Sequence, residues 1–160
     1  MELDETDYKV LRALQGDGRM SYRDIAKQIS VSEGTVYNRV KAMEAANVIR
    51  GSTIDISYSQ LGYIMTAIVG MRIQGGHLPE IEGRISEDPN VLAVYDVTGE
   101  YDAVVIVKVR TREELNGFVK RINALPHVER TYTMLALDVL KESPGIIVQP
   151  PAAAQPRREK

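Results

Sequence analysis

Apolar residues between positions 21 and 50 recur with the period of an α-helix. A first set has the spacing i, i+3, i+4, i+7, which gathers side chains on one helical face: Tyr22, Ile25, Ala26 and Ile29. A second set follows at helical spacing after a short interruption: Val36, Val40 and Met43. The residues between the two sets, Ser30 to Ser32, form a tight turn, so the pattern predicts two helices, the second packed back onto the first by one side.

Polar side chains occupy the free side of the second predicted helix: Glu33, Gly34, Thr35, Tyr37, Asn38 and Lys41. Ser32 suits the N-cap of this helix, and Ser21, with Asp24 three residues later, nearly matches a capping box for the first. Donors and acceptors on a helix held from behind are typical of helices that read the DNA major groove. The same pattern also occurs in ordinary helix pairs of globular proteins, which is the alternative interpretation.

A further helix is predicted from Asp4 to Gln15, with Asp4 as its N-cap. Its core-facing side carries Leu3, Asp7, Val10, Leu11 and Leu14. Glycines at 16 and 18 end it. The N-terminal part of the chain is therefore expected to be a three-helix bundle of the kind found in DNA-binding domains. Residues 52 to 57 then alternate between apolar and polar, which favours a strand, either a small wing or the start of a linker.

The second half of the chain has a different pattern. Period-two or continuously apolar stretches predict strands at 66–73, 91–98, 101–110 and 129–141. Helical spacing predicts helices at 77–86 and 112–125, the latter with a capping box of Thr111 and Glu114. The order β-α-β-β-α-β is that of a ferredoxin-like domain, a four-stranded antiparallel sheet with two helices on one face. The fold class is therefore α+β.

Both alternating sets of side chains are apolar in the stretches 104–109 and 135–140. A sheet with helices on only one face is expected to be polar on the other. The second face therefore needs covering, which predicts a partner subunit packed sheet to sheet. From residue 146 the periodicity is lost, and we expect roughly the last ten residues to be disordered, with Arg157 and Arg158 in an inert tail in preference to DNA contact.

Composition changes this picture in two respects. The chain has no cysteine, an acidic N-terminus without an apolar core, and no apolar run near the ~18 residues of a membrane helix, so we expect a soluble, cytoplasmic protein. The net charge of -2 is unfavourable for binding DNA, whose phosphates attract cations. Local basic residues in and beside the two-helix stretch offset this: Arg19, Arg23, Lys27, Arg39, Lys41 and Arg50.

The sequence resembles the Lrp/AsnC regulators, also called feast/famine regulatory proteins, over roughly residues 2 to 145. The N-terminal likeness rests on Leu3-Asp4, Asp7, Asp17-Gly18-Arg19, Ile25-Ala26, Ser32, Val36, Arg39, Glu44 and Val48-Ile49. The C-terminal likeness rests on the hairpin Gly99-Glu100-Tyr101-Asp102 and on Lys141-Glu142-Ser143-Pro144. The resemblance implies a helix-turn-helix, winged-helix-like domain at 1–50, a linker at 51–64, an amino-acid-sensing and oligomerisation domain at 65–145, and a tail at 146–160.

This resemblance also implies partners and sites. Family members form dimers through the C-terminal domains, read pseudo-palindromic double-stranded DNA, and often assemble into octamers with amino acids bound at the seams between dimers. DNA contact is carried over to Ser32, Glu33, Thr35, Tyr37, Asn38, Arg39 and Lys41. For Arg39 the alternative is a structural ion pair with an acidic neighbour. Gly34 stands where many relatives carry a larger polar residue, so fewer base contacts are expected there.

The effector site implied by the resemblance combines the hairpin of one subunit with a segment of another: Gly99, Glu100, Tyr101 and Asp102 with Thr131 and Thr133. Backbone amides at a glycine turn can hold an α-carboxylate, Asp102 can pair with an α-ammonium, and threonine hydroxyls can complete the hydrogen bonds. The alternative for Gly99 is that a tight hairpin simply needs glycine.

Two other functions compete with a gene-specific regulator. A haem-precursor decarboxylase-like enzyme shares the two-domain layout, but it needs histidines lining a tetrapyrrole pocket, and only His77 and His127 occur, both near predicted helix ends where a solvated histidine is expected. No Ser/His/Asp set, phosphate loop or metal-ligand cluster is evident, so we expect no catalysis, metal or cofactor. The other alternative is an architectural protein that wraps DNA without responding to an effector.

Overall fold

The computed structural model describes residues 1–143 and 145–151. The chain divides into two compact units, one formed by Met1–Asp55 together with the C-terminal segment from Ser143, and the other by Ile56–Glu142. The disorder expected for roughly the last ten residues, and the inert role expected for Arg157 and Arg158, fall almost wholly on residues 152–160, outside the described residues. Among the helices that the structure describes, none has the length and apolar content needed to cross a membrane.

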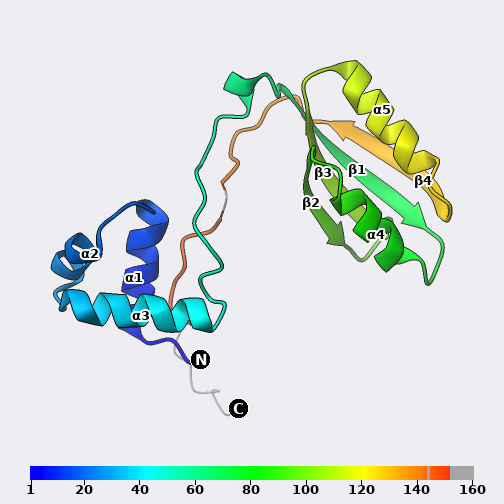
Figure 1. Ribbon diagram of the computed structural model, residues 1–160. Helices are drawn as coiled ribbons and strands as arrows, with labels where there is room; N and C mark the ends of the chain where they lie inside the picture. The colour runs from blue at the N-terminus through cyan, green and yellow to red at the C-terminus, as the bar shows by residue number, and fades with distance from the viewer. Residues whose placement is uncertain (144, 152–160) are drawn as a thin grey trace, which may run out of the picture. The chain divides into compact units, whose positions relative to one another are not determined.

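The N-terminal unit contains the three expected helices, α1 (Glu5–Gly16), α2 (Tyr22–Ile29) and α3 (Glu33–Ala45) (Figure 1). Each begins where its cap was predicted. Asp4 and Asp7 form a reciprocal capping box at the start of α1, and the side chains of Ser21 and Ser32 accept hydrogen bonds from backbone N–H groups in α2 and α3. At Ser21 only half of the box forms, since its hydroxyl also donates to Asp24 at 2.6 Å.

A short turn between α2 and α3 sets the geometry of this helix pair. Ser30 ends α2 in the left-handed region, with φ 59° and ψ 49°, and the N–H of Val31 bonds back to the carbonyl of Ala26 at 3.0 Å. Seven side chains drawn from all three helices form the buried core: Val10, Ala13, Ile25, Ala26, Val36, Val40 and Met43. The core thus holds one side of α3 and leaves its other side free.

Residues 52–57 form no strand, so the strand suggested by their alternation is wrong. Both Ile54 and Ile56 are exposed. Alternation specifies a strand only where a neighbouring backbone can complete the ladder, and within the described residues this segment has none. A short 3₁₀ turn, η1 (Ser59–Leu61), follows it.

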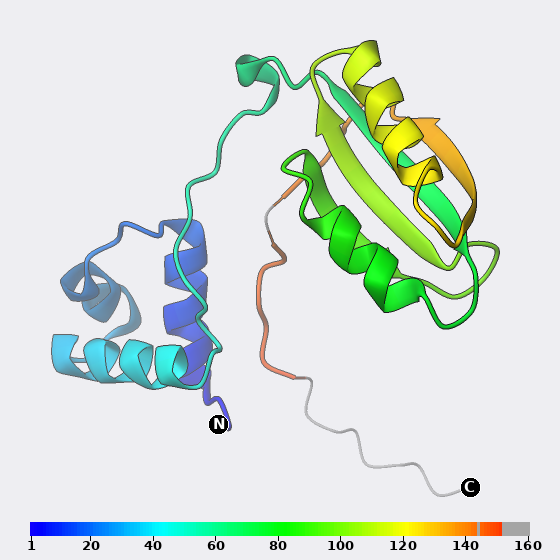
Figure 2. The same ribbon diagram turned by 45° about the vertical axis from the view of Figure 1, so that its right-hand side comes forward.

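The second unit is a ferredoxin-like domain with the predicted order of elements. Its strands are β1 (Met65–Ile73), β2 (Val91–Asp96), β3 (Ala103–Val109) and β4 (Val128–Leu135), and its helices are α4 (Leu78–Ser86) and α5 (Arg112–Asn123). The sheet order is β2-β3-β1-β4 and every neighbouring pair is antiparallel. Both helices lie on the same face of this sheet (Figure 2). The sequence-based fold class is therefore confirmed.

The two faces of the sheet differ in what covers them. On the face under the helices, alternate residues of β1 and β3 are fully buried, including Val69, Met71, Val105 and Val107. The opposite face carries Ile68 and Ile106, which are paired across β1 and β3, and Met134 of β4 beside Ile68. Apolar side chains on both faces were predicted for β3, and the structure shows them there.

The strand β4 ends earlier than predicted. Residues 136–141 were expected to continue it, but Leu135 is its last residue, and Leu137 is fully exposed. The reason lies in the register, because β4 pairs only with β1 and Leu135 faces Ala67, close to the start of β1 at Met65. One more hydrogen bond forms, from the Ala136 N–H to the Thr66 carbonyl at 2.9 Å. Beyond this point β1 has almost no residues left for β4 to pair with, because β1 begins at Met65.

Part of the C-terminal segment is held by α1, a contact that was not predicted from the sequence. The Gln15 amide donates to the carbonyl of Ile146 at 2.8 Å and accepts from the N–H of Val148 at 3.1 Å. A side-chain amide that both donates to and accepts from one extended segment mimics a strand pairing. The segment therefore belongs to the N-terminal unit although it follows the C-terminal domain in sequence.

Gly70, in the middle of β1, is expected to be essential for packing on the open face of the sheet. A Cβ at this position would lie 2.9 Å from three ring atoms of Tyr101. Gly70→Ala should therefore destabilise the protein by about 1–3 kcal/mol, the usual cost of overpacking. Urea unfolding followed by circular dichroism measures this change. Gly83→Ala in α4, where an added Cβ meets nothing within 4 Å, is the matched control and should be neutral or slightly stabilising; equal effects at both sites would refute the argument.

Candidate DNA-contact and effector sites

The free side of α3 presents the residues expected to touch DNA. Tyr37 is 49% exposed, and Asn38 and Lys41 are also exposed. The Tyr37 ring meets the ring of Tyr22 edge to face, with centroids 6.2 Å apart, so the aromatic pair ties the start of α2 to the exposed side of α3. Tyr37 is thus in contact with a neighbouring ring on one side and exposed on the other.

Near the start of α3, candidate residues also serve the helix itself. The Ser32 hydroxyl accepts from the Thr35 N–H at 3.0 Å and lies 2.8 Å from the Thr35 hydroxyl. Glu33 lies 3.7 Å from the Arg23 guanidinium of α2, and both side chains are largely exposed. Exposed ion pairs of this kind contribute little to stability and exchange readily for other partners. These groups therefore remain available to a ligand at the N-terminus of α3.

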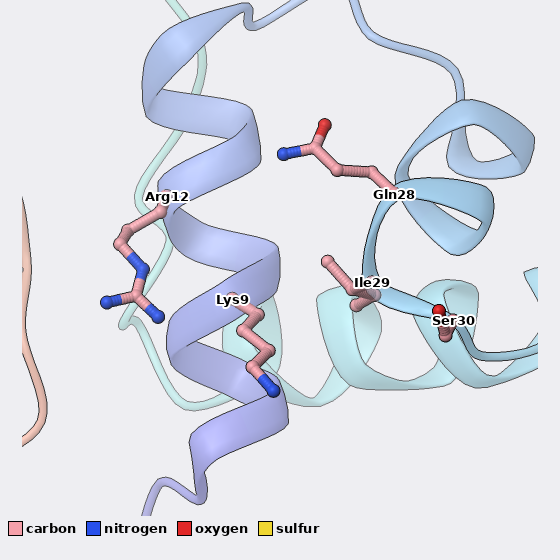
Figure 3. Close-up of a pocket in the computed structure, with 5 residues that line it drawn as sticks. All are labelled: Lys9, Arg12, Gln28, Ile29 and Ser30. Carbon is pink, nitrogen blue, oxygen red and sulfur yellow. The ribbon is translucent and has the colours of Figure 1, made fainter.

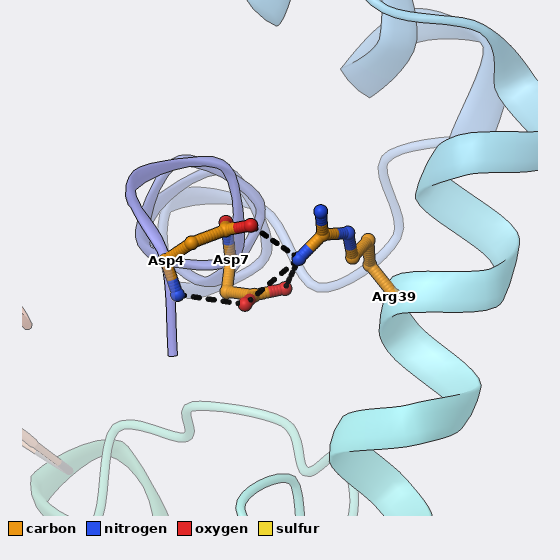
Figure 4. A network of polar contacts seen from close by, with 3 residues as sticks. All are labelled: Asp4, Asp7 and Arg39. Atoms are coloured by element: carbon orange, nitrogen blue, oxygen red, sulfur yellow. Dashed lines mark hydrogen bonds and ion pairs between the residues drawn. The ribbon is translucent and has the colours of Figure 1, made fainter. Parts of the chain in front are cut away.

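Lys41 and Arg39 are both paired, but in different ways. Lys41 contacts Glu44 at 2.7 Å on the helix surface, and this hydrogen bond raises the pKa of the Lys41 ammonium. Arg39 instead crosses to α1, where its Nη1 lies 2.6 Å from the Asp4 carboxylate and 3.1 Å from that of Asp7 (Figure 4). The ion pair named as the alternative for Arg39 is therefore present, and we do not include Arg39 among the proposed base contacts.

The contact of Arg39 with α1 is built around a buried charge. Asp7 is fully buried, and its carboxylate also accepts the Asp4 N–H at 2.9 Å. The pKa of Asp4 is lowered first by the hydrogen bond from the Asp7 N–H and also by the Arg39 guanidinium. A carboxyl group whose pKa is lower in the folded state than in the unfolded state adds stability at pH values above its unfolded-state pKa. This stability is lost as the pH falls through the folded-state pKa. The cluster therefore favours the folded state at neutral pH and weakens in acid.

Most of the basic residues near α3 are already neutralised by acidic neighbours. Arg23, Lys27, Arg39 and Lys41 each pair with Asp or Glu. Arg19 and Arg50, by contrast, form no ion pair among the described residues. A separate open groove of about 520 Å³ lies between α1 and α2 and is lined by Lys9, Arg12, Gln28, Ile29 and Ser30 (Figure 3). It carries none of the predicted DNA-contact residues.

The hairpin expected to bind an effector is fixed to the sheet through Asp102. Gly99 has φ 120°, a conformation that favours glycine, as the alternative reading of this position required. The Asp102 carboxylate accepts the Ile73 N–H at 2.8 Å, and the Asp102 N–H donates to the Met71 carbonyl at 2.9 Å. Asp102 therefore has a structural role, and its carboxylate keeps acceptor capacity for a ligand ammonium, chiefly on the oxygen that does not bond Ile73.

The other candidate effector residues fall on different faces of the sheet. The Tyr101 ring packs over Gly70 on the open face and stacks near Tyr132, with centroids 6.2 Å apart. Thr131 and Thr133 pair with Met71 and Val69, which places them on the helix-covered face. The Thr131 hydroxyl donates to Asn123 at the end of α5 at 3.1 Å. Tyr101 and the two threonines therefore lie on opposite faces of the sheet within one chain.

The two histidines contact each other and also remain partly exposed to solvent, as expected for histidines near helix ends. The His77 and His127 rings stack with centroids 3.5 Å apart and an interplanar angle of 2°. The His127 Nδ1 lies 3.1 Å from the Gln74 amide oxygen. Among the described residues no group of at least three His, Cys, Asp or Glu side chains is arranged to hold a metal ion.

An exposed, capped helix of a helix-turn-helix pair, joined to a ferredoxin-like domain, defines a two-domain DNA-binding regulator. Comparison with known families agrees. The family model described as winged helix-turn-helix DNA-binding matches residues 3–50, and the model described as Lrp/AsnC ligand binding domain matches residues 66–146. The chain belongs to the Lrp/AsnC family of transcription regulators. No wing strand follows α3 in residues 51–57.

Relatives and solved structures support this assignment. An HTH-type transcriptional regulator of Pyrococcus furiosus is 49% identical over 142 residues, which cover 89% of this chain and 96% of the relative. The structure of Escherichia coli AsnC has a TM-score of 0.85 at 28% identity and covers 92% of this chain and 100% of its own. The leucine response regulatory protein LrpA of Mycobacterium tuberculosis has a TM-score of 0.79 at 26% identity, covering 91% and 100%. The named relatives are regulators, so the protein is not an enzyme.

Sequence reasoning did not identify the acidic partners of Arg39 inside the N-terminal unit, nor the partner of Lys108 inside the sensing unit. Asp7 was assigned to the apolar stripe of α1. Residue spacing within α1 does not reveal which residue of α3 lies beside Asp7, so its contact with Arg39 could not be predicted. The buried Lys108 was likewise taken as part of an apolar strand, although its Nζ lies 2.8 Å from the Glu142 carboxylate. A charged residue at a core-facing or central-strand position is the signal that identifies both.

Removing Arg39 should destabilise the N-terminal unit. In Arg39→Met the aliphatic stem remains while the fully buried Asp7 carboxylate loses its cation, at a cost of about 3 kcal/mol. Thermal or urea unfolding measures the loss. Lys41→Met, which breaks an exposed pair on the same helix, is the control and should cost under about 1 kcal/mol. If both variants were equally stable, Arg39 would not hold α3 in place.

Proposed function

We propose that this protein is a sequence-specific transcription regulator whose DNA binding responds to an amino acid. The observation that carries the proposal is the free side of α3, which is polar and exposed while its other side is fixed by the core and by Arg39. A helix held in one orientation can present donors and acceptors to base edges with the accuracy that base readout requires. The proposal includes action in the cytoplasm, where DNA and amino acids are both accessible to a regulator.

The proposed contacts divide by chemistry. Asn38 and Tyr37, in the exposed middle of α3, are assigned to base edges, since an amide can bond adenine and an aromatic ring can contact a thymine methyl. The start of α3 is assigned to phosphate oxygens and to nearby base edges, which approach the N-terminus of a helix in the major groove. The residues there are Ser32, Glu33 and Thr35. Lys41 is assigned to a phosphate, which competes with Glu44 for the ammonium.

The sheet supports a dimer. On its open face one row of paired residues runs across all four strands: Tyr95, Val104, Gly70 and Tyr132. The neighbouring row is Ala93, Ile106, Ile68 and Met134. Two large rings at the edges, 54% and 49% exposed for Tyr95 and Tyr132, flank an apolar centre. We infer that a second copy covers this face, giving the two-fold symmetry that a pseudo-palindromic site matches, with further assembly to an octamer.

The proposed effector site uses the hairpin of one subunit and the Thr131 and Thr133 region of another. The hairpin offers backbone amides around Gly99 and the remaining oxygen of Asp102, and the exposed Glu100 stands beside them. The ligand-binding family model and the leucine response named for the Mycobacterium tuberculosis relative support an amino acid as the ligand. A ligand that prefers one assembly state shifts the population of assemblies and therefore DNA affinity.

Asn38→Ala tests base readout. Loss of an amide that bonds a base should weaken operator binding by about 1–3 kcal/mol while non-specific binding changes little. Fluorescence anisotropy with operator and scrambled duplexes at one salt concentration measures both affinities. Asn116→Ala, an exposed substitution of the same type on α5, is the control and should change neither. Equal losses on both duplexes would count against a base contact by Asn38.

Asp102→Asn tests the effector site without removing the hairpin's anchor. The amide oxygen can still accept the Ile73 N–H, whereas the negative charge for a ligand ammonium is lost. Amino-acid response should fall at least tenfold in ligand concentration while DNA affinity without ligand stays unchanged. The readout is operator binding titrated with each amino acid. An unchanged response would place the ammonium contact elsewhere.

A further inference from the structure

Lys108, near the end of β3, is a buried cation on the open face of the sheet. Its side chain is 9% exposed, although a lysine in a strand with one solvated face normally reaches water. Its Nζ lies 2.8 Å from the Glu142 carboxylate and donates to the Thr66 hydroxyl at 3.1 Å. The ammonium also lies 5.5 Å from the centre of the Tyr58 ring, which adds a cation–π contact.

A small pocket opens beside this ammonium. Its volume is about 200 Å³, below the roughly 300–1,000 Å³ of pockets for drug-sized ligands. Lys108 is its cationic residue, and the other lining residues are mainly apolar or aromatic and come from the segment before β1 and from the start of β2: Ile56, Tyr58, Leu61, Tyr63, Pro89, Asn90, Val91 and Leu92. The Tyr58 and Tyr63 rings meet edge to face, with centroids 6.1 Å apart, and form one wall.

An apolar pocket with one convergent cation suits a small molecule that has an anionic end and an apolar body. A carboxylate can accept hydrogen bonds from the Lys108 ammonium and the Thr66 hydroxyl together, as the Glu142 carboxylate already does with the ammonium. Glu142 is held less firmly than Lys108, since its side chain is 36% exposed. Exchange of one carboxylate for another keeps the buried cation paired, so the exchange avoids the cost of an unpaired buried charge.

We propose that Lys108 and this pocket bind small apolar monocarboxylates, such as an aliphatic amino acid or its ammonium-free analogue, in competition with the chain's own Glu142. The site differs from the proposed hairpin site in every residue. On β3, Lys108 is four residues beyond Val104, and it pairs with Thr66 of β1. The proposal does not depend on the proposed function, because it concerns ligand binding by the sensing domain alone.

Glu142 is the last residue of the sensing unit. Lys108 holds its carboxylate, so a carboxylate that replaces Glu142 releases this residue from the ammonium. The segment that begins at Ser143 belongs to the DNA-binding unit, where Gln15 bonds to Ile146 and Val148.

Isothermal titration calorimetry on the full-length protein, in a buffer without carboxylates, tests the site. L-leucine, 4-methylpentanoate and L-leucinamide are the probes. Binding of leucine or of 4-methylpentanoate, with leucinamide at least tenfold weaker, is the expected result, and comparison of the first two tells whether the ammonium contributes. Leucinamide binding as tight as leucine would overturn the proposal, because leucinamide lacks the carboxylate.

Three variants locate the bound carboxylate. Lys108→Met should weaken binding at least tenfold, and Glu142→Gln should tighten it about three- to tenfold by removing the competitor's charge. Glu129→Gln, an exposed acidic position on β4, is the matched control and should leave binding unchanged. If Lys108→Met does not fold, as judged by circular dichroism, Glu142→Gln decides: unchanged or weaker binding overturns the site.

Asp102→Asn separates this site from the hairpin. Leucine binding at Lys108 should persist in that variant with an unchanged dissociation constant. If Asp102→Asn abolishes all measurable binding, the only ligand site is the hairpin, and the proposal for Lys108 is wrong. If binding persists while operator affinity never responds to leucine, the Lys108 site stands and the amino-acid response proposed above fails.

Discussion

The ion pair between Arg39 and the two aspartates at the start of α1 is the interaction on which the DNA-reading surface depends. The three helices share a small core of seven buried apolar side chains, which holds one side of α3, and the ion pair adds a polar contact between α3 and α1. Asp7 is fully buried, and a buried carboxylate without a cation is strongly unfavourable. Arg39 satisfies it from α3, so the pair links α3 to the start of α1. A charge therefore contributes to the orientation of α3 beside the apolar core.

The sensing domain also contains a buried charge that is held by a partner of opposite charge. Its helices cover one face of the sheet, and the other face carries apolar side chains. Near one end of that face the buried Lys108 pairs with the Glu142 carboxylate. In the proposed dimer a second copy covers this face and spaces two recognition helices. The proposed dimer contact and the proposed carboxylate site therefore lie on one sheet, so a bound small molecule can act on assembly.

Local patterns were sufficient for the helices and for most of the sheet. The caps at Asp4, Ser21 and Ser32 follow from side-chain chemistry within four residues, and β1 and β3 follow from apolar stretches of strand length. Prediction failed where a partner backbone decides the outcome. Residues 52–57 alternate without a neighbour, and β4 stops where β1 has no more residues to pair with. Contacts between distant residues, such as Arg39 with Asp7 or Gln15 with Ile146, leave no periodic trace in the sequence.

The most direct test of the regulator assignment is a gel-shift titration on the DNA upstream of the protein's own gene, with and without a pool of the twenty amino acids. Autoregulation is an expectation from the family resemblance and makes this fragment the best first target. The account predicts a discrete complex that survives non-specific competitor DNA and whose affinity or mobility changes with the pool. A salt-sensitive smear on any DNA, unchanged by amino acids, would contradict it and support an architectural role.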